Sequence, residues 1–494
     1  MSSALLLGID EGTTAVKAAL FDRDLCAVAE ARRAVGVTHP RAGWVEQDPE
    51  QILEAVVDAV AEVLELAGDR EVIAGGLDHQ GESVLGWDAD SGRALTPVIV
   101  WQDTRQEDLL AELAAAGAAR ARGAVERSGL PLDPYFSAGK LAWLLERHQG
   151  VARARDAGTL RLGTVDAFLT DRLGSRFATD LSTASRTQLL AVTGRDWDEQ
   201  LMSLFGVSRV WLPAIGPTFG SLGELSHARW PAAIPLRAQL VDQQAALAGS
   251  GAVQPGEVKA TYGTGVFVLG RTQGPVLASG LLPTIAWAAP DSAGGVGEIA
   301  YALDGGVFAA GSLLDWLAKG LGLAPDTAAL AASAAQAGDS AGVIVLPALA
   351  GLGAPWWRPG AHGVIAGLHP AVGAAHIARA ALEAIAWRVV DIVEAMAGVA
   401  PVHRLRVDGG LTNDETLLQI QADALGLPLM VGRADATVLG AAMLAGVGAG
   451  AFASVEDAAR LLEPGRVIEP RSDPLARAAA RARWLEFVQA VASL

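Results

Sequence analysis

Two short polar turns, far apart in the chain, carry small residues of the kind that can hold phosphate groups. The first lies within residues 8–17, where Asp10, Gly12, Thr13 and Thr14 separate two apolar runs. Glycine lets backbone N–H groups approach phosphate oxygens, hydroxyls add donors, and a carboxylate such as that of Asp10 can bind Mg²⁺. Taken alone, the segment also fits an ordinary Asp/Gly turn.

The second turn spans residues 262–265, with Gly263 and Thr264 between the strand-like residues 257–261 and 266–269. The first turn does not have the spacing of a P-loop. Two facing Gly/Thr turns would hold a polyphosphate from both sides. The pair therefore favours nucleotide binding over two ordinary turns.

A third candidate is the segment 407–413, in which an apolar strand runs into Gly409 and Gly410 and then towards a helix over 415–425. A turn without side chains lets an adenine or ribose lie against the backbone, with Asn413 and the helix N-terminus as donors. Taken alone, this is a common strand-to-helix turn.

Asp242 follows the apolar residues 240–241 and precedes a Gln-Gln pair. A carboxylate at the end of a strand can accept the proton of a substrate hydroxyl while a phosphoryl group is transferred to it. The same position also suits a helix N-cap, and both roles can hold at once.

The elements that must position these residues alternate between strands and helices. Apolar runs predict strands over 5–9, 16–21, 72–77 and 98–101, and Asp48 with Pro49 begins a helix whose apolar stripe runs from residue 52 to 64. A strand, a turn and a strand open each half, which predicts an α/β protein with two related halves. We expect domains at 1–250 and 251–494. Residues 436–455, rich in Ala and Gly, predict a close-packed buried helix and turn, and 473–494 predict a surface helix.

Composition limits the classes of partner. The 494 residues carry 38 Lys and Arg against 55 Asp and Glu, a net charge of 38 − 55 = −17, and 51% are hydrophobic. This proportion of hydrophobic residues predicts a folded protein. The lack of a run of basic residues argues against nucleic-acid or membrane partners. Any anionic ligand must therefore be bound by a few residues at one site and not by an extended basic surface. The single Cys26 is expected to be a small buried residue, and the N-terminus without a basic signal region predicts a cytoplasmic protein.

The chain resembles the FGGY carbohydrate kinases, and within them the glycerol kinases. Besides the turns above, the resemblance rests on segments 43–49, 100–103, 133–137, 140–143, 163–166, 184–187, 351–357 and 363–383. It implies two ribonuclease-H-like domains of the actin/hexokinase/Hsp70 ATPase superfamily, with ATP and Mg²⁺ in the cleft between them. Homo-oligomers are common in that family.

The resemblance also implies roles for single residues. Asp242 is the expected catalytic base, Asp10 and Asp242 are the magnesium partners, and Thr13, Thr14 and Lys17 surround the γ-phosphate. Gly263 and Thr264 would hold the other phosphates, and the nucleotide pocket would be lined by Gly311, Gly409, Gly410 and Asn413, with Asp414 able to replace Asn413. The substrate positions are Gln80, Gly81, Glu82, Trp101, Tyr135, Asp242, Gln243 and Phe267.

One departure bears on the substrate. Residues 79–83 read His-Gln-Gly-Glu-Ser where glycerol kinases have Asn-Gln-Arg-Glu-Thr, so Gly81 stands in place of an arginine that would donate to substrate hydroxyls. We therefore expect an ATP-dependent kinase of a small polyol or sugar, with a pentulose or tetritol kinase as the alternative. An actin- or Hsp70-like nucleotide-gated binding protein is the alternative from another class.

Overall fold

The computed structural model describes residues 4–277, 280–358, 360–462 and 465–491, and its two main sheets have matching strand orders. The first has the order β11-β12-β5-β1-β2-β3, with β1 (Leu5–Glu11), β2 (Ala15–Phe21), β3 (Ala27–Ala34), β5 (Val72–His79), β11 (Glu224–Leu225) and β12 (Ile234–Val241). The second has the order β15-β16-β14-β13-β19-β20-β21, with β13 (Glu257–Tyr262), β14 (Val266–Thr272), β15 (Leu282–Pro290), β16 (Val296–Val307), β19 (Arg404–Asp408), β20 (Leu429–Val431) and β21 (Arg466–Ile468).

The two sheets repeat one topology. In the first, β1 pairs antiparallel with β2 and parallel with β5, and β5 pairs parallel with β12. In the second, β13 pairs antiparallel with β14 and parallel with β19, and β19 pairs parallel with β20. The prediction of two related halves, each opened by a strand, a turn and a strand, is confirmed.

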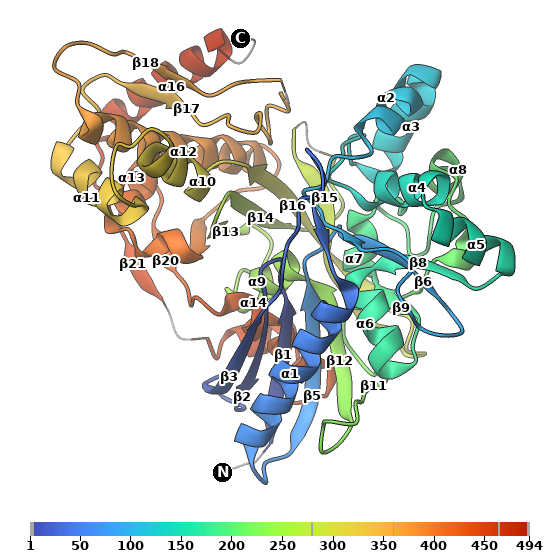
Figure 1. Ribbon diagram of the computed structural model, residues 1–494. Coiled ribbons are helices and arrows are strands. Elements are labelled where there is room, and N and C mark those ends of the chain that lie inside the picture. Colours follow the sequence, from blue (N-terminus) through green and yellow to red (C-terminus); the bar gives the residue numbers. More distant parts are fainter. Residues whose placement is uncertain (1–3, 278–279, 359, 463–464, 492–494) are drawn as a thin grey trace.

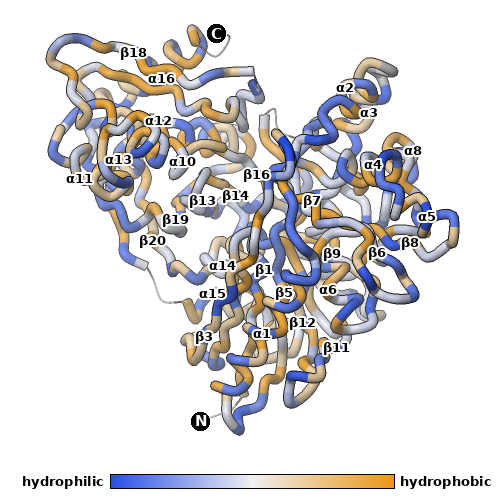
Figure 2. Tube along the Cα trace, viewed as in Figure 1, coloured by the Kyte–Doolittle hydropathy of each residue, from blue (hydrophilic) through white to orange (hydrophobic). Residues whose placement is uncertain are grey.

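Local sequence explains the helix that covers the first sheet, α1 (Pro49–Ala67). The Asp48 side chain accepts a hydrogen bond from the backbone N–H of Glu50, and Pro49 occupies the first turn, where its missing N–H costs nothing. The apolar stripe from Ile52 to Leu64 packs on buried residues of β1, β2 and β5 in one cluster. Figure 2 shows hydrophobic segments running through this part of the molecule.

Two helices join the halves. α9 (Asp242–Gly249) and α14 (Ala436–Gly448) pack against each other, α14 lies on β1, β5 and β12 of the first sheet, and α9 also contacts β13 and β14 of the second. Figure 1 shows both helices near the centre of the molecule. A β-carbon added at Gly440 would lie 1.8 Å from the carbonyl oxygen of Ala245, and one at Gly8 or Gly76 would lie 2.1 Å from a carbonyl oxygen of α14. The predicted close-packed helix and turn over residues 436–455 are therefore confirmed, with the helix ending at Gly448. Small residues are required in the helix because backbones touch.

The remaining elements surround this centre. Smaller sheets are formed by β4 (Glu46–Gln47), β7 (Val98–Ile99), β6 (Val84–Asp88) and β8 (Leu160–Thr164), by β9 (Ala178–Asp180) with β10 (Ala214–Gly216), and by β17 (Ile344–Leu346) with β18 (Val364–Ala366). The other helices are α2 (Glu107–Ala116), α3 (Ala118–Ser128), α4 (Ser137–Arg147), α5 (Gln149–Ala157), α6 (Val165–Gly174), α7 (Leu181–Arg186), α8 (Glu199–Phe205), α10 (Gly311–Asp315), α11 (Thr327–Ala337), α12 (Ala374–Ala397), α13 (Glu415–Leu425), α15 (Val455–Ala459) and α16 (Pro474–Val491), with short helical turns η1 (Arg209–Trp211), η2 (Trp316–Gly320) and η3 (Gly410–Asn413). Among the described residues, no helix is both long and apolar enough to cross a membrane.

Two local expectations differ from the structure. The strand expected over 98–101 ends at Ile99, because Trp101 turns away and its backbone N–H donates to the hydroxyl of Ser83 at 3.0 Å. Cys26 is exposed and not buried, because the turn after β2 is closed by its own polar groups, with Asp22 accepting from the backbone N–H of Cys26. The C-terminal surface helix is confirmed as α16, which buries Trp484 and Val488.

Candidate active site

The turn between β1 and β2 places its polar residues at the edge of the first sheet. In the ladder, Asp10 lies opposite Lys17 on β2 and opposite Asp78 on β5. Thr14 is exposed at the tip, and the ammonium group of Lys17 pairs with Glu30 at 2.9 Å. Asp10 and Lys17 therefore lie at neighbouring positions beside an exposed turn, as a phosphate site would require.

The matching turn between β13 and β14 meets the other residues predicted for nucleotide binding. The backbone N–H of Gly311 donates to the carbonyl of Gly263 at 3.1 Å, and that of Ser312 donates to the carbonyl of Thr264. A β-carbon at Gly409 would lie 2.4 Å from the carbonyl oxygen of Tyr262, so this glycine, with φ of +96°, is required by a close backbone approach. The structure thus brings Gly263, Thr264, Gly311 and Gly409 together.

Asn413 and Asp414 have different surroundings. Asn413 is exposed in η3, beside Gly410, to whose carbonyl its amide donates at 3.2 Å. Asp414 caps α13 through the backbone N–H of Thr416 at 2.8 Å, and its other carboxylate oxygen is buried without a hydrogen-bond partner among the described residues. Asn413 is the more accessible of the two.

A small cavity of about 100 Å³ lies where the two halves meet. The predicted substrate residues Gln80, Glu82, Trp101, Tyr135, Asp242, Gln243 and Phe267 line it, as do Thr13, Arg186, Val241, Gln244, Leu269 and Asp304. Gly81 does not line it. A β-carbon at Gly81 would contact Val241, which lines the cavity, at 3.3 Å.

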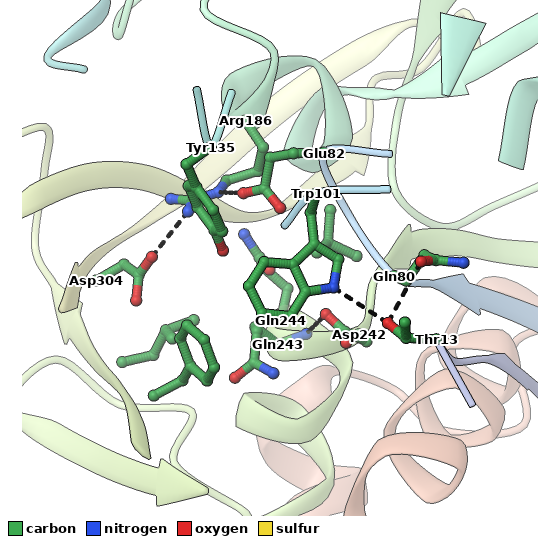
Figure 3. A pocket seen from close by; sticks show the side chains of 13 residues that line it. Thr13, Gln80, Glu82, Trp101, Tyr135, Arg186, Asp242, Gln243, Gln244 and Asp304 are labelled. Atoms are coloured by element: carbon green, nitrogen blue, oxygen red, sulfur yellow. Dashed lines mark hydrogen bonds and ion pairs between the residues drawn. The ribbon is translucent and has the colours of Figure 1, made fainter. Parts of the chain in front are cut away.

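Aromatic rings form one side of the cavity (Figure 3). The ring of Trp101 meets those of Tyr135 and Phe267 edge to face, with centroids 5.7 and 6.1 Å apart. Its indole N–H donates to the hydroxyl of Thr13 at 3.1 Å, which links this wall to the β1–β2 turn. Such a wall covers a carbon chain while leaving polar groups on the other sides to meet hydroxyls.

Buried carboxylates gather at the end of the cavity nearest the β1–β2 turn. Burial, together with the charges of Asp10 and Glu82, raises the pKa of Asp242 to about 7. Burial likewise raises the pKa of Asp10, and burial with the charge of Asp10 raises the pKa of Asp78. A carboxylate with a raised pKa is a better proton acceptor than an ordinary aspartate, as a general base requires.

The same carboxylates are candidate ligands for a divalent cation. Among the described residues, no group of three or more metal-ligating side chains converges on one point. Mg²⁺ is commonly held by one or two carboxylates together with waters and substrate phosphates, so this arrangement is compatible with it. Both carboxylate oxygens of Asp78 are buried beside Asp10 without a hydrogen-bond partner in the described chain, and a cation there would compensate them.

Two buried cations were missed by the sequence reasoning. Lys259 donates to the side-chain oxygen of Gln243 and to the hydroxyl of Thr261, each at 2.7 Å. Arg186 donates to Glu82 at 2.7 Å and pairs with Asp304 at 2.8 Å. Gly81 supplies no donor to the pocket, but Arg186, at the end of α7, places a guanidinium group there. Its segment 184–187 was noted, but its partner Asp304 lies in the other half, and no local pattern joins them.

Known proteins resemble the chain over nearly its whole length. Residues 5–249 match the N-terminal domain of the FGGY family of carbohydrate kinases, and residues 258–449 match its C-terminal domain. The chain is 43% identical to a glycerol kinase from Geobacter sp. over 455 residues, 90% of each protein, and 43% identical to one from Aromatoleum aromaticum over 497 residues, 98% of each. A crystal structure of Plasmodium falciparum glycerol kinase with ADP superimposes with a TM-score of 0.91 at 30% identity, covering 99% of this chain and 98% of that one.

Proposed function

The chain belongs to the FGGY family of carbohydrate kinases, and on that premise we propose that it transfers the γ-phosphoryl group of ATP to a hydroxyl of a small polyol or sugar. The observation that carries the proposal is the position of Asp242, on the wall of a buried cavity lined by aromatic rings and polar groups. A cavity of this size suits a small polyhydroxy compound.

Asp242 orients the attacking hydroxyl and accepts its proton as the phosphoryl group arrives. Trp101, Tyr135 and Phe267 cover the carbon chain and exclude water, the competing acceptor. Lys259 binds the side-chain oxygen of Gln243, which fixes this amide and leaves its N–H groups to donate to the substrate. Catalysis then consists of positioning and charge stabilisation.

The nucleotide would lie between the two turns. Thr13, Thr14 and Lys17 from the first turn and Gly263 and Thr264 from the second would hold the phosphates. The base and ribose would lie against Gly311, Gly409, Gly410 and Asn413. Asp10 and Asp242 would hold Mg²⁺, which would neutralise the negative charge of the phosphates. The ADP in the similar Plasmodium kinase supports a nucleotide in this family.

The charge of the cavity favours an uncharged substrate. Glu82, Asp242 and Asp304 line it together with one arginine, so acids outnumber cations. A sugar acid would place another negative charge among buried carboxylates, which low-dielectric surroundings make costly. We therefore propose neutral polyols and sugars as the acceptor class. A homo-oligomer and a cytoplasmic location stay predictions.

An ADP-release assay coupled to a spectroscopic readout tests the proposal. Purified enzyme with MgATP would be offered glycerol, erythritol, threitol, xylitol, ribitol, xylulose and ribulose, with gluconate as the charged control. We expect acceptor-dependent ADP release with at least one neutral compound and none with gluconate. ATP hydrolysis that no acceptor stimulates would instead favour a nucleotide-gated binding protein.

A further inference from the structure

The end of the cavity away from Asp242 is built around an arginine shared by two acids. Figure 3 shows Asp242 and Thr13 on one side of the pocket and Asp304 on the other, with Arg186 between Glu82 and Asp304. Glu82 follows β5 and Arg186 ends α7, both in the first half of the chain, whereas Asp304 lies on β16 in the second. All three side chains are at least nine-tenths buried.

Two polar atoms of this ion-pair group make no hydrogen bond. Nη1 of Arg186 and Oδ1 of Asp304 are buried and have no hydrogen-bond partner within the described chain. Because Nη2 of Arg186 and Oδ2 of Asp304 form the ion pair at 2.8 Å, the unused donor and the unused acceptor belong to the same pair of side chains.

A neighbouring amide adds a second acceptor. The side-chain nitrogen of Gln244 donates to the hydroxyl of Thr284 at 3.0 Å and to the carbonyl of Ile285 at 3.3 Å, which fixes the orientation of the amide. Its oxygen is buried and has no partner in the described part of the protein. Unpaired buried polar atoms are costly, so three of them on side chains that line one cavity indicate a polar ligand.

Among possible ligand groups, a hydroxyl matches these unpaired donor and acceptor atoms best. One hydroxyl both accepts and donates, so it can accept from Arg186 and donate to Asp304 or Gln244. An anion would satisfy Arg186 but would face the carboxylates of Asp304 and Glu82. An ammonium group would satisfy Asp304 but would face the guanidinium.

We propose that Arg186, Asp304 and Gln244 form a second hydroxyl-binding subsite, which selects a neutral acceptor of four or five carbons over glycerol. This proposal rests on the kinase activity proposed above. The hydroxyl that receives the phosphoryl group lies at Asp242, the next hydroxyls meet Gln243 and Glu82, and the hydroxyls farther along the chain meet the subsite. A three-carbon acceptor ends before it.

The test combines chain length with one substitution. Asp304→Asn keeps the size of the side chain and removes its charge, and Asp24→Asn, on the exposed turn after β2, is the matched control. Values of kcat/KM would be measured for glycerol, erythritol and ribitol, or for the pentulose preferred in the screen. We expect wild type to prefer a longer acceptor over glycerol by more than tenfold. Asp304→Asn should lower kcat/KM more than tenfold for the five-carbon acceptor and less than threefold for glycerol, and Asp24→Asn should change neither.

A substrate analogue provides a test that does not depend on the folding of a variant. A five-carbon acceptor lacking the hydroxyl farthest from the phosphorylated carbon should bind and react with wild type at least tenfold less well than its parent. Equal losses for all chain lengths in Asp304→Asn, or equal kcat/KM for parent and deoxy analogue in wild type, would overturn the subsite while leaving the kinase proposal intact. Failure of every neutral acceptor to stimulate ADP release would overturn the kinase proposal itself.

Discussion

Burial gives Asp242 the properties on which the proposed chemistry depends. The carboxylate begins α9, and it accepts a hydrogen bond at 2.6 Å from the backbone N–H of Gln243, so its orientation is fixed before a substrate enters. The helix N-cap role that the sequence left open for Asp242 is wrong, because Asp242 is the first helical residue and Val241 occupies the N-cap position.

Replacing Asp242 by Asn should abolish turnover and leave nucleotide affinity nearly unchanged. The amide keeps the shape of the side chain but cannot take up a proton, and loss of a positioned base commonly lowers rates by about 10²–10⁴-fold. Steady-state rates and the dissociation constant of ATP, measured on the purified variant, check this. A variant within tenfold of wild type would remove Asp242 from the mechanism.

Asp78 should make the enzyme without ligands less stable as the pH rises. Its folded-state pKa is raised well above 3.8, by burial first and by the charge of Asp10 second. Between about pH 4 and the raised pKa of Asp78, the folded state therefore holds a proton that the unfolded state has lost, and the free energy of unfolding falls as pH increases through this window. Asp78→Asn removes this dependence, and its amide can donate to Asp10.

Thermal unfolding of wild type and Asp78→Asn at pH 6 and pH 8, without nucleotide or Mg²⁺, tests this effect. We expect Asn to raise the melting temperature, and to raise it more at pH 8. Asp24→Asn, which changes the same charge on the surface, should leave the pH dependence as in wild type. A lower melting temperature for Asp78→Asn at pH 8 would contradict the argument.

The sequence predicted most residues that line the cavity, but it did not predict the ion pair that sets the charge of the cavity. Trp101, Tyr135 and Phe267 lie in motifs, so their positions could be predicted. The contact between Arg186 and Asp304 depends on how the two halves meet, and no spacing encodes it. The glycine at position 81 likewise does not reveal that Arg186 supplies a guanidinium group to the pocket. Gly81 has φ of +72°, so Gly81→Arg would also strain the backbone and is a poor test of specificity.

At the scale of elements, the two strand-turn-strand units are equivalent in the topology of their sheets. Thr14 and Thr264 are both exposed at the tips of these turns. Both threonines are therefore accessible to a ligand.

Thr14→Ala and Thr264→Ala should each weaken the use of ATP. Each variant deletes one hydroxyl donor from one side of the phosphate site, at a cost of about 1–3 kcal/mol if the bond is made to a charged oxygen. Titration of ATP at a saturating acceptor concentration gives the apparent KM for each variant. If only one substitution raises it, the nucleotide is held from one side alone.

Elements with strong local signals could be predicted well. The helix over 415–425 and the helix that begins at Pro49 were placed at their observed starts, because capping residues and apolar stripes mark them. The small-residue helix α14 was predicted, but not the sheet that it covers. Its packing uses glycines of β1 and β5, and small residues indicate that backbones approach closely but not which two segments meet.

At the scale of the whole molecule, we propose domain limits at 1–250 and 251–494 along the chain. The matches to the two family domains end and begin close to this boundary. One apolar cluster nevertheless crosses it, because Leu6 and Leu240 pack with Leu269, Trp287 and residues of α14. The halves are therefore joined by a shared core as well as by the chain.

The place of α14 has a consequence for biosynthesis. The helix covers β1 and β5, yet the ribosome makes it only after every strand of the second sheet through β20. Until residue 448 has left the exit tunnel, the nascent chain exposes the face of its first sheet on which Gly8 and Gly76 await a backbone partner. The N-terminal half therefore cannot bury this face of its first sheet until most of the second half has been made.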